Sequence, residues 1–101
     1  WVADYPDPDT FGATLVGTGA TMNTGYSNNA VDHLIQTSRQ YADRGDATSD
    51  LRTLQQDIAR DVPVIPLWQR KQYVLSSEDV GGSQYLDDGT GVYRLWSLNW
   101  I

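Results

Sequence analysis

The chain opens with the stretch WVADYPDPDTF, residues Trp1–Phe11, in which an apolar segment runs into a turn rich in carboxylates. Trp1–Ala3 have the composition of a β-strand, whereas Pro6 and Pro8 fix their own φ and remove two backbone donors. The strand is therefore expected to end near Asp4. A carboxylate held where a buried strand emerges is partly desolvated, so it gains most from a cation with matching hydrogen-bond donors. The stretch thus predicts a binding site.

A short helix and a polar loop are expected after this turn. The Asp7 side chain is suited to cap a helix whose first turn holds Pro8 and whose apolar side includes Phe11. The following stretch, Gly17–Asn28, is rich in Gly, Thr, Asn and Ser, which predicts a surface loop. Tyr26 is expected to anchor that loop.

Two further helices are expected to pair as a hairpin. Apolar residues recur at helical spacing over roughly 29–43, with Ser27 or Asn28 as the cap and Gly45 as the end. A similar pattern predicts a helix over roughly 47–60 that starts at Asp46 or Thr48.

The rest of the chain predicts strands. Val62–Trp68 is a continuous apolar run that contains two prolines, which restrict it to an edge or a ladder end. Gln72–Leu75 is expected to form another strand, Asp88-Gly89 a tight turn, and Val92–Trp100 the last strand.

Four ordered blocks of sequence resemble the family 5 extracellular solute-binding proteins, which are receptors of oligopeptide and dipeptide ABC importers. The first block is similar to the family's W-x-x-D-Y-x-D-P-x-x-F signature, and the others follow in order along the chain. The matching blocks are Trp1–Phe11, Gly25–Asn28 with Val31–Ile35, Arg52 with Asp61–Leu67, and Val92-Tyr93 with the aromatic tail.

The resemblance implies an α+β fold that is the C-terminal part of a two-lobed, periplasmic-binding-protein-like receptor. Family members are several times longer, so residues 1–101 are expected to be one fragment, mostly from the second lobe. The final strand, about 92–101, is expected to pack on the first lobe, in the N-terminal remainder of the receptor. The family also implies an extracellular location, as a periplasmic protein or a membrane-anchored lipoprotein, and an ABC permease as partner.

The resemblance also implies roles for the first four residues. Asp4 occupies the position where peptide receptors place an acceptor for the α-ammonium group of the ligand, and Trp1 matches a tryptophan that walls a side-chain pocket. The backbones of Val2 and Ala3 are suited to bind the peptide backbone as a strand would. Two alternatives remain for these side chains, since Asp4 could instead cap the turn and Trp1 could instead pack in the core. Strict strand alternation would also place Trp1 and Asp4 on opposite faces.

Cofactor, metal and enzyme readings are weaker. Asp7 and Asp9 are expected to be a helix cap and a solvated carboxylate. A calcium loop starting at Asp7 would lack oxygen ligands at Phe11 and Thr18. His33 is the only histidine and there is no cysteine, so we expect no zinc site, no cofactor and no nucleophilic triad. The protein is expected not to be an enzyme.

Charge and composition exclude one class of partner and leave others open. The net charge is −6, and seven Lys and Arg are scattered among thirteen acids. This pattern excludes nucleic-acid binding. A peptide or a related small solute is the expected ligand. The alternatives are a carbohydrate- or glycolipid-binding protein, or a receptor for a nickel or haem chelate.

Overall fold

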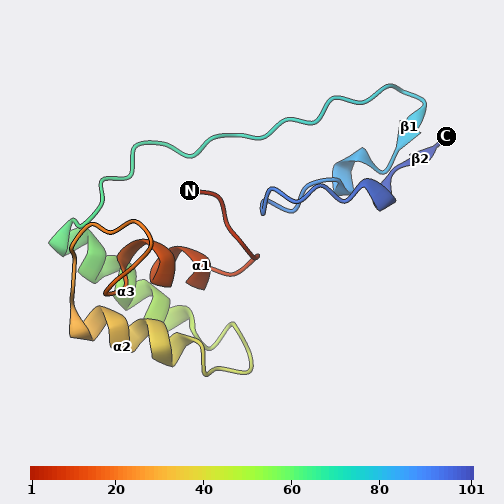
Figure 1. Cartoon of the computed structure of the whole chain (residues 1–101). Helices are drawn as coiled ribbons and strands as arrows, with labels where there is room; N and C mark the ends of the chain where they lie inside the picture. The colour runs from red at the N-terminus through yellow and green to blue at the C-terminus, as the bar shows by residue number, and fades with distance from the viewer. The chain divides into compact units, whose positions relative to one another are not determined.

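The computed structural model describes every residue from Trp1 to Ile101. The chain forms two compact units (Figure 1). The helical unit is Asp7–Pro66, and the second unit combines Trp1–Pro6 with Leu67–Ile101. A mixed α+β composition is therefore confirmed, with the helices in one unit and a small sheet in the other.

The helical unit contains three helices. Helix α1 (Asp9–Phe11) continues into a π-helical turn, Gly12–Val16, and is followed by α2 (Asn29–Ser38) and α3 (Thr48–Asp61). Helices α2 and α3 pack directly against each other, which confirms the predicted hairpin. None of the helices combines the length and the apolar composition that a membrane crossing requires.

One small core holds these helices together. Val16, Val31, Ile35 and Leu54 are buried in a single cluster. These residues come from the π-helical turn, α2 and α3, so the core joins these three elements. Tyr26, from the loop before α2, packs against the cluster, as expected of an anchor.

Local capping explains where α2 begins and ends. The Asn28 side chain accepts hydrogen bonds from the backbone N–H groups of Ala30 and Val31, which confirms it as the cap. The helix ends at Ser38, so the expectation of a helix to about residue 43 is wrong. The Arg44 guanidinium donates to the Ser38 carbonyl and satisfies one of the groups that a helix end leaves open.

The second unit contains a two-stranded antiparallel sheet. Strands β1 (Val80–Gly81) and β2 (Asn99–Trp100) pair with Val80 opposite Trp100 and Gly81 opposite Asn99. Between them lie two 3₁₀ turns, Ser83–Tyr85 and Leu95–Ser97. Gly82 must be a glycine, because its φ is 81° and an added Cβ would lie 1.9 Å from the Ser97 carbonyl oxygen.

The chain reverses direction around Asp88-Gly89, where a tight turn is expected, through a loop of five residues, 88–92. Asp87 and Tyr93 form an isolated antiparallel bridge on either side of it. The Asp87 carboxylate accepts a hydrogen bond from the Gly89 N–H, and Gly89 has a φ of 87°.

Most of the expected strands are absent, and these predictions are wrong. Trp1–Ala3, Val62–Trp68 and Gln72–Leu75 contain no strand, and Val92–Trp100 contains only β2. A strand requires a neighbour that accepts and donates its ladder hydrogen bonds. The only regular ladder in the chain is the one between β1 and β2, so the other apolar segments have the composition of strands without a partner.

Candidate functional site

The four residues with predicted ligand contacts lie at the start of the second unit. Trp1 is 55% exposed, Val2 and Asp4 are exposed, and Ala3 is half-buried. Val2 lies beside the turn that follows Asp87, since a Cβ added to Gly91 would be 3.6 Å from Val2 Cγ1. The backbones of Val2 and Ala3 make no hydrogen bond within the chain, so their donors and acceptors are open to other groups.

The other two acids of the opening stretch are held by arginines from the helical unit. Asp7 accepts from Arg44 at 2.7 Å to Nε and 2.9 Å to Nη2, and also from the Asp9 N–H at 2.9 Å. The Arg44 hydrogen bond lowers the pKa of Asp7, and the Asp9 N–H adds to this effect. Asp7 thus binds the first turn of the helix, as expected, while also forming an ion pair that the sequence did not reveal.

Asp9 is not the solvated carboxylate that the sequence suggested. The residue is only 8% exposed, and its Oδ1 lies 2.8 Å from Arg39 Nε. Arg39 directly follows α2, so this ion pair ties the first helix to the end of the second. Asp4, Asp7 and Asp9 therefore differ in placement, and Asp4 is the exposed one of the three.

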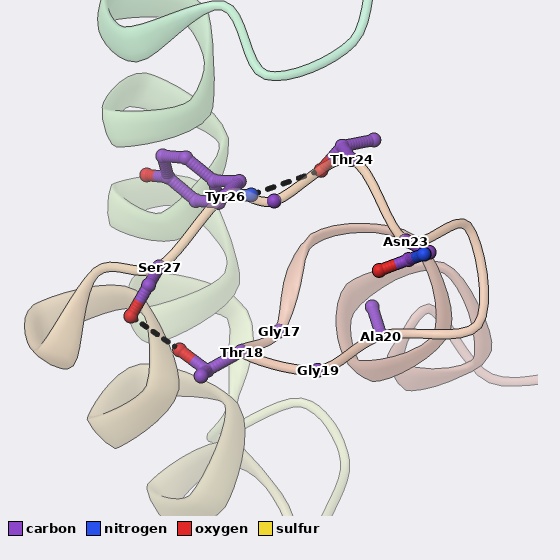
Figure 2. Close-up of a pocket in the computed structure, with 9 residues that line it drawn as sticks. Gly17, Thr18, Gly19, Ala20, Asn23, Thr24, Tyr26 and Ser27 are labelled. Atoms are coloured by element: carbon purple, nitrogen blue, oxygen red, sulfur yellow. Dashed lines mark hydrogen bonds between the residues drawn. The ribbon is translucent and has the colours of Figure 1, made fainter.

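A polar hollow of about 150 Å³ lies in the loop between the π-helical turn and α2 (Figure 2). Its lining is Gly17, Thr18, Gly19, Ala20, Asn23, Thr24, Gly25, Tyr26 and Ser27. No charged side chain belongs to this lining, so the hollow lacks the groups that fix a charged ligand.

Side-chain hydrogen bonds fix the two ends of this loop. Thr18 Oγ1 lies 3.0 Å from Ser27 Oγ (Figure 2) and donates to the Asp32 carboxylate at 2.5 Å. The Thr18 N–H also donates to Asp32 at 2.8 Å. Asp32, in the first turn of α2, thereby holds the loop closed. The sequence predicted the loop but not the hollow, whose loop is closed by these contacts between residues nine and fourteen positions apart.

The far side of the loop is joined to α3 through Asp61. The Tyr26 hydroxyl donates to Asp61 Oδ2 at 2.6 Å, and the Asn28 side-chain amide donates to the same oxygen at 2.9 Å. Desolvation by burial and the Asp61 contact raise the pKa of Tyr26. The hydrogen bonds from Tyr26, Arg60 and Asn28 lower the pKa of Asp61 to about 2.

Replacement of Tyr26 by Phe should raise the pKa of Asp61 from about 2 toward its ordinary value of 3.8, because the hydrogen bond from the Tyr26 hydroxyl to Asp61 is lost. The depressed pKa of Asp61 contributes stability above pH 3.8, and this contribution is lost as the pH falls from 3.8 toward 2. The measurement is a carboxyl carbon NMR titration of Asp61. Tyr41→Phe is the control, since Tyr41 interacts with Asp50 instead. An identical Asp61 pKa in all three proteins would show that the Tyr26 contact is not formed.

The remaining candidate for chemistry is His33. This residue is exposed on α2, as expected of a surface histidine. No three His, Cys, Asp or Glu side chains gather in a group that could hold a metal ion.

A comparison with curated proteins finds a relative that is a dipeptide-binding protein. The chain is 31% identical over 83 residues to the dipeptide-binding protein DppE of Bacillus subtilis (strain 168). The match covers 81% of this chain and 15% of the length of DppE. No protein-family model matches the sequence, and no solved structure matches it.

This alignment supports the family resemblance that the four sequence blocks carry. It covers most of the chain, as the ordered blocks from Trp1 to Tyr93 predict, and it leads to a protein of the same family. The chain spans about 15% of the length of this relative, so it corresponds to a small part of such a protein. The chain is related by sequence to the family 5 extracellular solute-binding proteins.

Proposed function

We propose that the chain is part of the substrate-binding component of an ABC importer that captures peptides outside the cell and delivers them to a permease. The observation that carries this proposal is the 31% identity to a dipeptide-binding protein over 81% of the chain. A binding role also accords with the acidic, exposed start of the chain.

Asp4 is the proposed acceptor for the α-ammonium group of the peptide. The side chains of a peptide vary but its termini do not, so a receptor tolerant of sequence gains most by placing charge at a terminus. Asp4 is exposed at the surface of its unit, and Asp7 and Asp9 form ion pairs with Arg44 and Arg39.

Backbone hydrogen bonds are the proposed source of sequence-independent affinity. Val2 and Ala3 make no hydrogen bond within the chain, so an extended peptide could pair with them as an added strand. The exposed Trp1 would then cover a ligand side chain, because an indole supplies a large apolar surface for stacking. In this arrangement the segment Trp1–Ala3 acquires the strand conformation that its composition favours.

The intact receptor is proposed to close two lobes around its ligand and to present the closed form to the permease, as hinged binding proteins do. This chain would supply mainly part of the second lobe. The tail at residues 92–101 would pack on the first lobe, which accords with the exposure of Trp96, Trp100 and Ile101. The receptor would work outside the cell, either in a periplasm or as a membrane-anchored lipoprotein.

Native mass spectrometry of the complete receptor, purified from its host, tests the proposed function. The proposal predicts that peptides of several masses co-purify with the protein, because termini and backbone are recognised and side chains are tolerated. A single sugar mass or a metal chelate in their place would contradict the assignment to peptides.

A further inference from the structure

Arg44 connects the opening stretch of the chain to the end of α2. Its Nε and Nη2 donate to the two oxygens of the Asp7 carboxylate at 2.7 and 2.9 Å, which makes the ion pair bidentate. Its Nη1 donates to the carbonyl of Ser38, the last residue of α2. Because the guanidinium is a rigid planar fork, these three contacts fix the orientation of the Asp7 carboxylate relative to the end of α2.

Asp7 is also held by the first helical turn. Its carboxylate accepts a hydrogen bond from the Asp9 N–H at 2.9 Å, and its carbonyl oxygen accepts one from the Thr10 N–H at 3.1 Å. The Asp7 side chain is only 22% exposed. Both the side chain and the backbone of Asp7 are therefore anchored to the residues that follow it.

The link from Asp7 back to Asp4 is short and stiff. Pro6 fixes its own φ, and the residues that precede the two prolines, Tyr5 and Asp7, are disfavoured from helical conformation. The backbone bends at each residue from Asp4 to Asp7, and Figure 1 shows this bend between the N-terminus and α1. Three residues span at most about 10 Å. The position of Asp4 is therefore tied to that of Asp7.

We propose that Arg44 is a positioning residue for recognition of the peptide α-ammonium group. By fixing Asp7, it holds the bend that presents the Asp4 carboxylate to the peptide. A hydrogen bond weakens steeply when donor and acceptor are misaligned, and ordering a loose segment costs part of the binding free energy. The inference rests on the role proposed for Asp4 and gives Arg44 no contact with the peptide, since Arg44 acts through Asp7.

Arg44→Lys and Asp7→Asn test this role in the complete receptor. Lysine keeps the positive charge without the planar fork, and asparagine keeps an acceptor for the Asp9 N–H without the carboxylate that pairs with Arg44. Calorimetry compares a peptide that co-purifies with the receptor and the N-acetylated form of the same peptide. Acetylation should weaken binding to the wild type by about tenfold or more, and binding to each variant by less than about threefold. The Kd of the acetylated peptide should stay within about twofold of its wild-type value, because that peptide lacks the charge that Asp4 binds.

Arg60→Lys is the matched control. Arg60 belongs to the same unit and pairs with Asp57 and Asp61, so its replacement also removes an arginine–carboxylate pair but should keep the wild-type acetylation penalty. If Arg44→Lys and Asp7→Asn weaken both forms of the peptide equally, or weaken neither, the positioning role is overturned while the role of Asp4 stands. A wild-type receptor without any acetylation penalty would overturn the role of Asp4, and the positioning role with it.

A double substitution tests whether Arg44 acts through Asp4. In the wild-type background, Arg44→Lys should raise the Kd of the free peptide by about threefold or more. In the Asp4→Ala background the same change should alter Kd by less than about twofold, because the carboxylate that it positions is absent. An equal loss of affinity in both backgrounds would show that Arg44 acts independently of Asp4, which contradicts the proposal.

Discussion

Leu54→Ala is expected to lower the free energy of unfolding of the helical unit by about 2–4 kcal/mol. Leu54 of α3 is 5% exposed and packs in the same cluster as Val16, Val31 and Ile35. Its truncation removes three buried carbon atoms and leaves a cavity in a core that has few other members. Urea denaturation of the 101-residue chain, followed by the far-ultraviolet circular dichroism of its helices, measures the change.

The same substitution at Leu75 is the control for this experiment. Leu75 is 97% exposed, so Leu75→Ala should change the stability of the isolated chain by less than about 0.5 kcal/mol. If the two substitutions destabilised the chain equally, the cluster around Leu54 would not be the core of the helical unit.

Asp4→Ala in the complete receptor is expected to weaken peptide binding by about 1.5–3 kcal/mol, which raises Kd by roughly 10- to 150-fold. The substitution removes the proposed charge-assisted hydrogen bonds to the α-ammonium group. Asp4 is exposed, so its loss should leave the fold intact. Isothermal titration calorimetry with a co-purified peptide measures the affinity.

Glu78→Ala is the matched control for Asp4→Ala. Glu78 is an exposed acid of the same unit without an ion pair, so its removal changes the net charge equally. We expect it to leave Kd within about twofold of the wild-type value, because Glu78 has no proposed contact with the ligand and salt screens the field of an exposed charge. An unchanged affinity of the Asp4→Ala receptor would eliminate the role proposed for Asp4.

The helices could be predicted from the sequence because their signals are local. Asn28 caps α2 from the position directly before the helix, and Val31 and Ile35 of α2 lie one helical turn apart. Leu54 follows the apolar spacing of its own helix, α3. The end of α2 was predicted too late, because its last carbonyl is bound by Arg44 from outside the helix. A contact of that kind has no periodic signature.

The strands could not be predicted in the same way, since a strand is defined by its partner. Val62–Trp68 and Gln72–Leu75 have apolar runs that favour strands, but no segment of the chain pairs with them. The one pair of strands that forms, β1 and β2, joins Val80 with Trp100 and Gly81 with Asn99. Apolar composition therefore identified segments suited to a sheet without identifying the sheet.

The opening stretch shows the same division between local and distant signals. The turn at the prolines and the binding of Asp7 to the first helical turn follow from neighbouring residues. The ion pairs of Asp7 with Arg44 and of Asp9 with Arg39 join residues at least thirty positions apart. The sequence therefore did not reveal these ion pairs, and it did not show that Asp9 is buried whereas Asp4 is exposed.

The central claim is that the Asp4 carboxylate binds the α-ammonium group of a peptide. Its most direct test compares a free peptide with its N-acetylated form, on the wild-type receptor and on the Asp4→Ala receptor, by calorimetry. Acetylation should weaken wild-type binding by about tenfold or more and Asp4→Ala binding by less than about twofold, since the interacting charge is then already absent. An acetylation penalty of the same size in both receptors would contradict the claim.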